Sequence, residues 1–86
     1  MKKITILIHC MDQSGIIAAV TNFIASKNGN IVYIDQHVDQ EQEVFFMRLE
    51  GEFDAESYNN TDFSTQFQQE IAQKFNMNWE LHTAAY

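Results

Sequence analysis

Residues 3–24 have the sequence KITILIHCMDQSGIIAAVTNFI, in which two hydrophobic patterns follow each other directly. Apolar side chains first occupy every second position, which predicts a β-strand with these residues on one face: Ile4, Ile6, Ile8 and Cys10. After Gly15 they recur at intervals of three and four, which predicts an amphipathic helix of about three turns: Ile16, Ala19, Val20, Phe23 and Ile24. Between the two patterns, residues 11–15 contain the Asp, Ser and Gly typical of a sharp turn.

The middle of the chain predicts a hairpin. Residues 28–30 are Asn-Gly-Asn, a composition that commonly ends a helix. Residues 31–39 are rich in β-branched and aromatic residues and predict a second strand, with one face formed by Val32, Ile34 and Val38. A polar break at residues 40–42 separates it from a third strand over residues 44–50, whose inward face is Phe45, Met47 and Leu49.

The last third of the chain predicts a second helix and a final strand. We expect a loop over residues 51–61 and a helix cap at Thr61 or Asp62. The helix carries apolar side chains at every fourth position: Phe63, Phe67, Ile71 and Phe75, with Ala72 beside them. Residues 76–82 alternate again, with one apolar face formed by Met77, Trp79 and Leu81.

These elements predict a single α+β domain over residues 1–86, with the order βαββαβ. Right-handed crossovers place both helices on one face of a four-stranded antiparallel sheet, which is the ferredoxin-like arrangement. No helix is left to cover the second face. Because the strands contain Phe, Met, Tyr and Trp, we expect an apolar patch there that supports self-association or the docking of another domain.

The composition argues against several partners and compartments. Twelve Asp and Glu against five Lys and Arg give a formal charge of −7, which repels nucleic acid and anionic membranes. Apolar runs are far shorter than the roughly 20 residues that span a bilayer, and the first residues do not resemble a secretion signal. We therefore expect a cytoplasmic protein. Cys10 is the only cysteine, which excludes an internal disulfide and fits a reducing compartment.

Three functions of ferredoxin-like domains need residues that are missing. An acylphosphatase needs a cationic loop after the first strand, but residues 11–15 contain no Lys or Arg. A metal chaperone needs paired thiolates, whereas Cys10 is the only cysteine in this chain. An RNA-recognition module needs aromatic residues two positions apart, whereas Phe45 and Phe46 are adjacent. Side chains two positions apart on a strand lie about 7 Å from each other. For this reason the side chains of Asp35, His37 and Asp39 do not converge on one metal ion. We therefore expect neither a bound metal nor a cofactor.

The turn at residues 12–15 has the chemistry to bind an amino acid. The N–H groups at a helix start attract a carboxylate, and the Asp12 side chain attracts an ammonium group. Purely structural roles are also possible for the residues of this turn and for Asn30. Asp12 suits a helix cap, and Gly15 suits a turn that needs backbone freedom. Asn30 suits a turn after the helix as well as contact with a ligand across an interface.

Residues 9–24 resemble the opening of an ACT domain, including its Asp-x-x-Gly turn. Residues 28–32, 35–39 and 45–50 narrow the resemblance to the N-terminal ACT domain of bacterial formyltetrahydrofolate deformylases, over residues 3–81. The resemblance implies a homodimer that pairs through sheet or strand edges, and an effector such as glycine or methionine. It also implies an effector site formed by Asp12, Gln13, Ser14, Gly15, Ile16 and Asn30.

The same resemblance implies regulation, and no catalytic residue, in this chain. The deformylases hydrolyse 10-formyltetrahydrofolate to formate and tetrahydrofolate, in one-carbon and purine metabolism. They do so with a formyltransferase-like domain that follows the ACT domain and carries a catalytic Asn, His and Asp. None of that domain is present in residues 1–86, so we expect it as a partner in the parent protein. Met11 replaces the usual Pro and softens the turn. The alternative is a purely structural assembly domain or a stand-alone ACT protein without a ligand.

Overall fold

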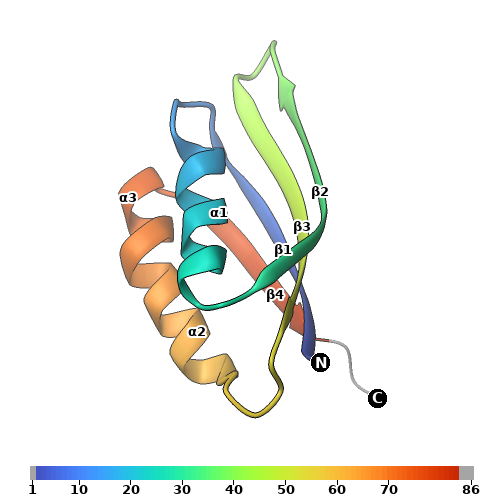
Figure 1. Ribbon diagram of the computed structural model, residues 1–86. Helices are drawn as coiled ribbons and strands as arrows, with labels where there is room; N and C mark the ends of the chain where they lie inside the picture. Colours follow the sequence, from blue (N-terminus) through green and yellow to red (C-terminus); the bar gives the residue numbers. More distant parts are fainter. Residues whose placement is uncertain (1, 84–86) are drawn as a thin grey trace.

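The computed structural model describes residues 2–83, and it confirms the predicted order of elements (Figure 1). The elements are β1 (Lys2–Met11), α1 (Ile16–Ser26), β2 (Asn30–Asp39), β3 (Val44–Phe53), α2 (Asn60–Phe67), the π-helical turn η1 (Gln68–Ala72), α3 (Gln73–Phe75) and β4 (Asn78–Thr83). Because α2, η1 and α3 follow each other without a break, they form one helical segment. Among the described residues, no helix has the length and apolar character to cross a bilayer. Residues 84–86, for which the sequence predicts no element, lie outside the described residues.

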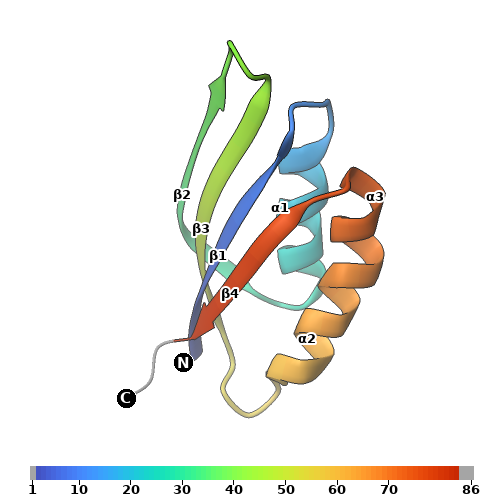
Figure 2. The same ribbon diagram turned by 180° about the vertical axis from the view of Figure 1, so that it is seen from behind.

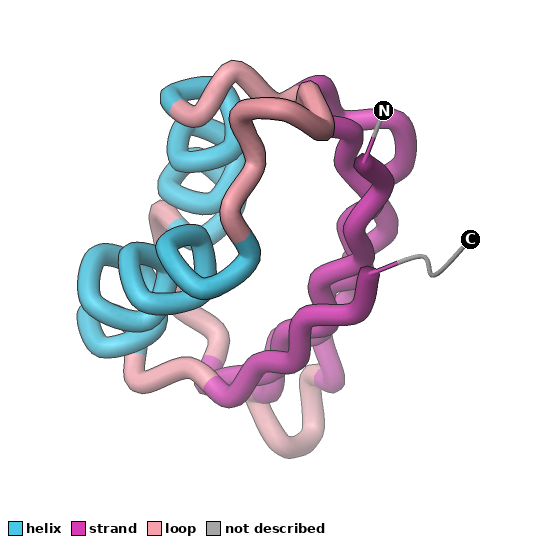
Figure 3. The backbone as a smooth tube through the Cα atoms, turned by 90° about the horizontal axis from the view of Figure 1, so that it is seen from below, coloured by secondary structure: helices cyan, strands magenta, loops and turns pink. Residues whose placement is uncertain are grey.

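The four strands form one antiparallel sheet in the order β2-β3-β1-β4, which can be followed across Figure 2. β1 is central and pairs with β3 along its whole length and with β4 from Ile4 to His9. Both helical segments lie on the same side of the sheet, as the view from below shows (Figure 3). The ferredoxin-like arrangement expected from the sequence is therefore confirmed.

The core fills the space between the helical layer and the sheet. Every second residue of β1 points into it, and Ile4 and Ile6 are completely buried. The Phe23 ring of α1 meets two rings of α2 edge-on, with centroids 5.3 Å from Phe63 and 5.4 Å from Phe67. The predicted inward residues of β1, α1, β3 and the second helical segment are buried, except Ala19, which is only partly buried. Of the inward residues predicted for the last strand, Met77 is buried, and Trp79 and Leu81 are partly buried.

The π-helical turn η1 explains how residues spaced by four share one face. An α-helix turns every 3.6 residues, so a spacing of four drifts by about 40° per step around the helix axis. The hydrogen bonds of a π turn reach five residues back, so η1 winds more loosely and offsets part of this drift. All four side chains with this spacing therefore face the core: Phe63, Phe67, Ile71 and Phe75.

The register of β2 differs from the prediction. Its pairing with β3 skips Val32, which is the extra residue of a β-bulge between Ile31 and Tyr33. Val32 therefore has no partner residue in β3, whereas Ile34 lies opposite Leu49 and Val38 lies opposite Phe45. A bulge depends on the partner strand, and the period-two pattern does not reveal it. No residue of β2 is fully buried, because β2 is an edge strand whose hairpin with β3 projects past the helices in Figure 1.

Two predicted boundaries are also wrong. β3 continues to Phe53, so the loop begins at residue 54, and both Gly51 and Phe53 are buried. Glycine disfavours a strand locally, but the burial of Phe53 in the core outweighs that preference. The cap of α2 is Asn59, whose side-chain oxygen accepts a hydrogen bond of 3.0 Å from the backbone N–H of Asp62. The predicted cap residues Thr61 and Asp62 instead lie in the first helical turn.

Candidate functional site

The turn between β1 and α1 leaves the start of the helix uncapped. Gly15 precedes α1 with φ at 91°, in the left-handed region that glycine adopts readily. No side chain caps the helix, which answers the open question about Asp12: it is not a helix cap. The first helical hydrogen bond runs from the Ala19 N–H to the Gly15 carbonyl at 3.0 Å. The N–H groups of residues 16–18 therefore have no partner within the helix.

Two hydrogen bonds hold this turn against distant parts of the chain, and a third lies within the turn. The Asp12 N–H donates to the Glu43 carbonyl at 2.8 Å, at the end of the β2–β3 hairpin. The Gln13 side-chain amide donates to the Met11 carbonyl and to the Phe75 carbonyl, both at 3.1 Å. The amide N–H groups of Gln13 are thus used within the chain.

The predicted site residues differ in what they present to solvent. The side chains of Asp12, Gln13 and Ser14 are exposed, as is Gly15, whereas Ile16 is 2% exposed and offers a ligand only its backbone. A Cβ atom at Gly15 would meet nothing within 4 Å, so there is open space beside this backbone.

Asn30 lies far from the turn within one chain. It is the first residue of β2 and pairs with Glu52, whose neighbour in β1 is Lys3. The turn follows the opposite end of β1, so nine residues of strand, about 30 Å at 3.3 Å per residue, separate Asn30 from Asp12. Five of the six predicted site residues are therefore together, and Asn30 lies apart from them.

Sequence reasoning missed the two carbonyl groups that hold the turn. Glu43 lies at the end of the hairpin with φ at 57°, and Phe75 lies at the end of α3. Neither backbone group has a signature in the residues around it. Their position beside the turn results from the order of strands in the sheet and from the packing of the second helical segment.

The open face of the sheet does not carry the expected apolar patch. Six of the seven Phe residues are buried in the core, and Phe46 alone lies on the open face, where it is 37% exposed. Its ring stacks between His9 and His37, with centroid distances of 6.1 and 5.0 Å. A hollow of about 640 Å³ lies over this row. Most other side chains of this face are polar or charged, because the core takes the apolar set of each strand.

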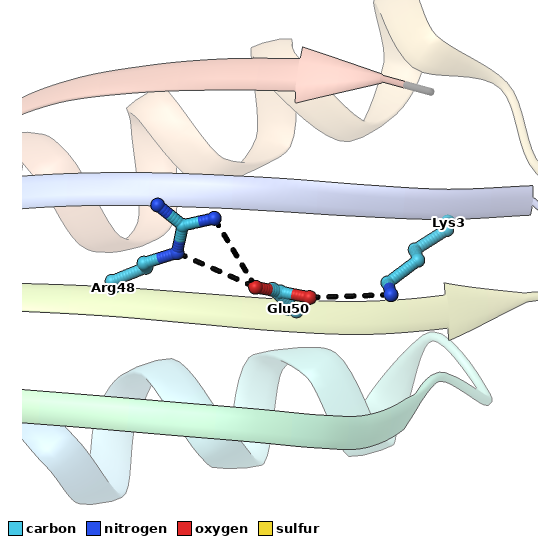
Figure 4. Close-up of polar contacts among 3 residues, drawn as sticks. All are labelled: Lys3, Arg48 and Glu50. Atoms are coloured by element: carbon cyan, nitrogen blue, oxygen red, sulfur yellow. Dashed lines mark hydrogen bonds and ion pairs between the residues drawn. The ribbon is translucent and has the colours of Figure 1, made fainter. Parts of the chain in front are cut away.

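Glu50 is the centre of a small charge network on this face (Figure 4). Its carboxylate oxygens lie 3.3 Å from the ammonium group of Lys3 and 3.3 Å from the guanidinium group of Arg48. The hydrogen bond from Lys3 and, to a smaller extent, that from Arg48 hold the pKa of Glu50 below its ordinary value. The network ties β1 to β3 at the solvent surface.

Acid titration is expected to reveal this network. The pKa of Glu50 is lower in the folded state than in the unfolded chain. Its contribution to stability is therefore present above the unfolded pKa of about 4.3 and is lost as the pH falls through the lower folded value.

The substitution Lys3→Met is expected to raise the pKa of Glu50 more than Arg48→Met does, because the hydrogen bond from Lys3 is the larger cause of the lowered pKa. NMR titration of the Glu50 carboxyl carbon measures both shifts. A larger rise of the Glu50 pKa in Arg48→Met than in Lys3→Met would contradict the assignment of Lys3 as the larger cause.

Cys10 lies on the buried face of β1. The Cys10 side chain is 5% exposed. Burial and, to a smaller extent, the negative charge of Asp12 raise the pKa of the Cys10 thiol, so the thiol stays protonated. The prediction that Cys10 acts as a small buried hydrophobe is confirmed. Within residues 2–83, no group of three or more His, Cys, Asp or Glu side chains could hold a metal ion.

Comparison with known proteins identifies relatives over most of the chain. The model of the ACT domain family matches residues 4–57. A formyltetrahydrofolate deformylase of Synechocystis is 32% identical over 78 residues, which are 91% of this chain and 27% of that protein. The deformylase 2 of Arabidopsis thaliana mitochondria is 40% identical over 67 residues, which are 78% of this chain and 20% of that protein. The chain therefore spans roughly a quarter or less of the length of these relatives.

Solved structures give the same result. A formyltetrahydrofolate deformylase from Pseudomonas syringae has a TM-score of 0.88 and 35% identity, and the match covers 100% of this chain and 28% of that one. An ACT domain protein from Streptococcus pneumoniae has a TM-score of 0.83 and 28% identity, over 99% of this chain and 98% of that one. Because the family model matches residues 4–57, which are more than half of the chain, and the structural matches cover nearly all of it, this chain belongs to the ACT domain family and resembles the N-terminal region of formyltetrahydrofolate deformylases.

Proposed function

We propose that this domain is regulatory and binds an amino acid at the Asp12–Gly15 turn. The observation that carries the proposal is the start of α1, where no side chain caps the helix and the Asp12 side chain is exposed nearby. The N–H groups of residues 16–18 bind the carboxylate of the ligand, and Asp12 binds its ammonium group. Ser14 adds an exposed hydroxyl to the same surface.

The domain pairs with a second copy through the edge of β2. This strand exposes 36% to 47% of four large apolar side chains: Val32, Tyr33, Ile34 and Val38. Its outer backbone groups face no other strand in the sheet order, which makes it a template for pairing. Antiparallel pairing of two β2 strands brings Asn30 of one copy to the Asp39 end of the other, the end at which the Asp12–Gly15 turn lies. Asn30 then completes the effector site of its partner.

In the parent protein, the effector sets the rate at which a catalytic domain hydrolyses 10-formyltetrahydrofolate to formate and tetrahydrofolate. The deformylase names of the relatives support this role, as does the share of 27% to 28% that the chain covers in the Synechocystis and Pseudomonas proteins. Glycine and methionine are the effectors we propose. A free, buried Cys10 fits a reducing compartment, and we propose the cytoplasm.

Calorimetry and sedimentation on the same protein test the proposal. We expect a dimer that binds glycine or methionine with a dissociation constant on the order of 1 mM or lower. The substitution Asp12→Ala is expected to weaken binding by about tenfold or more, because it removes a hydrogen bond to a charged group, and to leave the dimer intact. The exposed Asp35 on the open face provides the matched control Asp35→Ala, which should bind normally.

Each other outcome has a definite meaning. A dimer that binds neither amino acid supports the alternative, a structural assembly domain, and contradicts sensing. Binding that is unchanged in Asp12→Ala places the effector elsewhere. A monomer at high concentration contradicts pairing through β2.

A further inference from the structure

A second hollow lies at the opposite end of α1 from the Asp12–Gly15 turn. Its volume is about 200 Å³, and it is bordered by Lys27 after α1, the end of β3, the loop over residues 54–59 and the first turns of α2. In Figure 1 this region lies at the bottom of the molecule, where the gold loop joins β3 to α2. Sites for drug-sized ligands typically measure about 300–1,000 Å³. The second hollow is therefore suited to a smaller molecule.

Aromatic rings form the apolar wall of the second hollow. Phe53 and Phe63 are 3% and 4% exposed, and their ring centroids lie 5.5 Å apart. The Tyr58 ring packs against both, at 5.2 Å from Phe53 and 5.7 Å from Phe63. Burial raises the pKa of Tyr58 to about 12, so its hydroxyl keeps its proton at neutral pH and donates to the Asn60 side-chain oxygen at 2.8 Å. Because Phe53 and Phe63 are almost fully buried, the partly buried Tyr58 ring forms most of the apolar surface that a ligand meets.

One cation and one anion border the same hollow. The Lys27 ammonium group donates to the side-chain oxygen of Gln66 and lies 5.4 Å from the centroid of the Phe23 ring. Neither contact supplies a full negative charge. Asp62 lies on the other border, in the first turn of α2, with its side chain exposed. The ion pairs found within residues 2–83 include neither Lys27 nor Asp62.

We propose that the second hollow binds a small zwitterion with an apolar side group, of the α-amino acid class. The carboxylate of the ligand pairs with Lys27, its ammonium group pairs with Asp62, and its side group packs on the aromatic wall. The opposite charges of Lys27 and Asp62 disfavour ligands that carry only one charge. A plain anion meets Asp62 and the net charge of −7, and a plain cation meets Lys27. A neutral zwitterion avoids both penalties.

This site shares no residue with the Asp12–Gly15 turn. The 11 residues of α1, about 16 Å of helix, separate the two ends of the domain. The two proposals therefore succeed or fail independently.

NMR titration of the 86-residue chain with L-phenylalanine tests the proposal. We expect saturable shifts of the backbone amides of residues 57–63, with a dissociation constant on the order of 1 mM. Two probes that each lack one charge, 3-phenylpropionate and 2-phenylethylamine, are expected to bind about fivefold more weakly, as for the loss of a partly exposed ion pair. Equal affinity of all three probes would contradict recognition of a zwitterion. The absence of saturable shifts in residues 57–63 would overturn the proposal.

Point variants assign the two charges. Lys27→Met and Asp62→Asn are each expected to weaken binding of L-phenylalanine about fivefold. Lys74 is the matched control, because its ammonium group also lies over a ring, 5.6 Å from the centroid of Phe75, but it does not border the hollow. Lys74→Met should bind L-phenylalanine as the unmodified chain does. A loss in Lys74→Met equal to that in Lys27→Met would refute the assignment.

Discussion

Replacing Phe67 with alanine is expected to lower the free energy of unfolding by about 4 kcal/mol. Phe67 is completely buried, with its ring centroid 5.4 Å from Phe23 and 4.5 Å from Trp79. It therefore joins α1, the second helical segment and β4. Truncation leaves a cavity where three elements meet, and a close-packed interior fills such a cavity only partly. Since small domains are stable by roughly 5–15 kcal/mol, a large part of the total stability is lost. Urea unfolding followed by circular dichroism measures the change.

Phe46 provides the matched control on the open face. It is 37% exposed and stacks only against His9 and His37, so Phe46→Ala is expected to cost about 1 kcal/mol. The chemical change is the same as in Phe67→Ala, but the Phe46 ring is far more exposed. Equal losses in the two variants would contradict the assignment of Phe67 to the centre of the core.

Replacing Gly29 with alanine is expected to lower the free energy of unfolding by about 3 kcal/mol. A Cβ atom at Gly29 would lie 2.5 Å from Cε1 of Phe53 and 2.9 Å from Cγ2 of Ile24. Both side chains are buried, and Tyr58 packs against the Phe53 ring, so neither neighbour gives way easily. The new methyl group therefore forces apart α1 and the end of β3. Thermal and urea unfolding of the variant measure the loss.

Two further variants separate this clash from a general effect of losing glycine. Phe53→Leu removes the ring atoms that the new Cβ meets, so the loss in the double variant should be smaller than the sum of the single losses. Additive losses would refute the clash. Gly15→Ala meets no atom within 4 Å and carries only the strain of φ at 91°, about 1 kcal/mol. A loss at Gly15 as large as that at Gly29 would show that backbone strain dominates instead.

Most of the fold follows from short-range patterns. The period of two in β1 and the helical spacing in α1 each specify one inward face, and that face is buried as predicted. The errors occur where a preference of neighbouring residues competes with packing. Gly51 suggests the end of a strand, but Phe53 beyond it belongs to the core. Val32 fits an alternating face, but the partner strand imposes a bulge on it.

The candidate sites were only partly predictable. The exposed Asp12–Gly15 turn follows from residue types that are adjacent in the sequence. Its anchors on Glu43 and Phe75 do not, since those residues lie 31 and 62 positions away from the groups that they bind. The second hollow likewise combines Lys27 with Asp62, which share no local pattern. Such sites are formed by the ends of elements that only the folded chain brings together.

By itself the sequence determined the order of strands and helices, most of the inward side chains and the turn that opens α1. These features depend on residues within one or two turns of each other, where periodicity and backbone preferences act directly. The tertiary structure alone decided the bulge in β2, the polar character of the open face, the contacts that hold the turn and the position of Lys27 and Asp62 on the border of one hollow. Each of these depends on which distant segments become neighbours, and that is set by the order of strands in the sheet and by packing in the core.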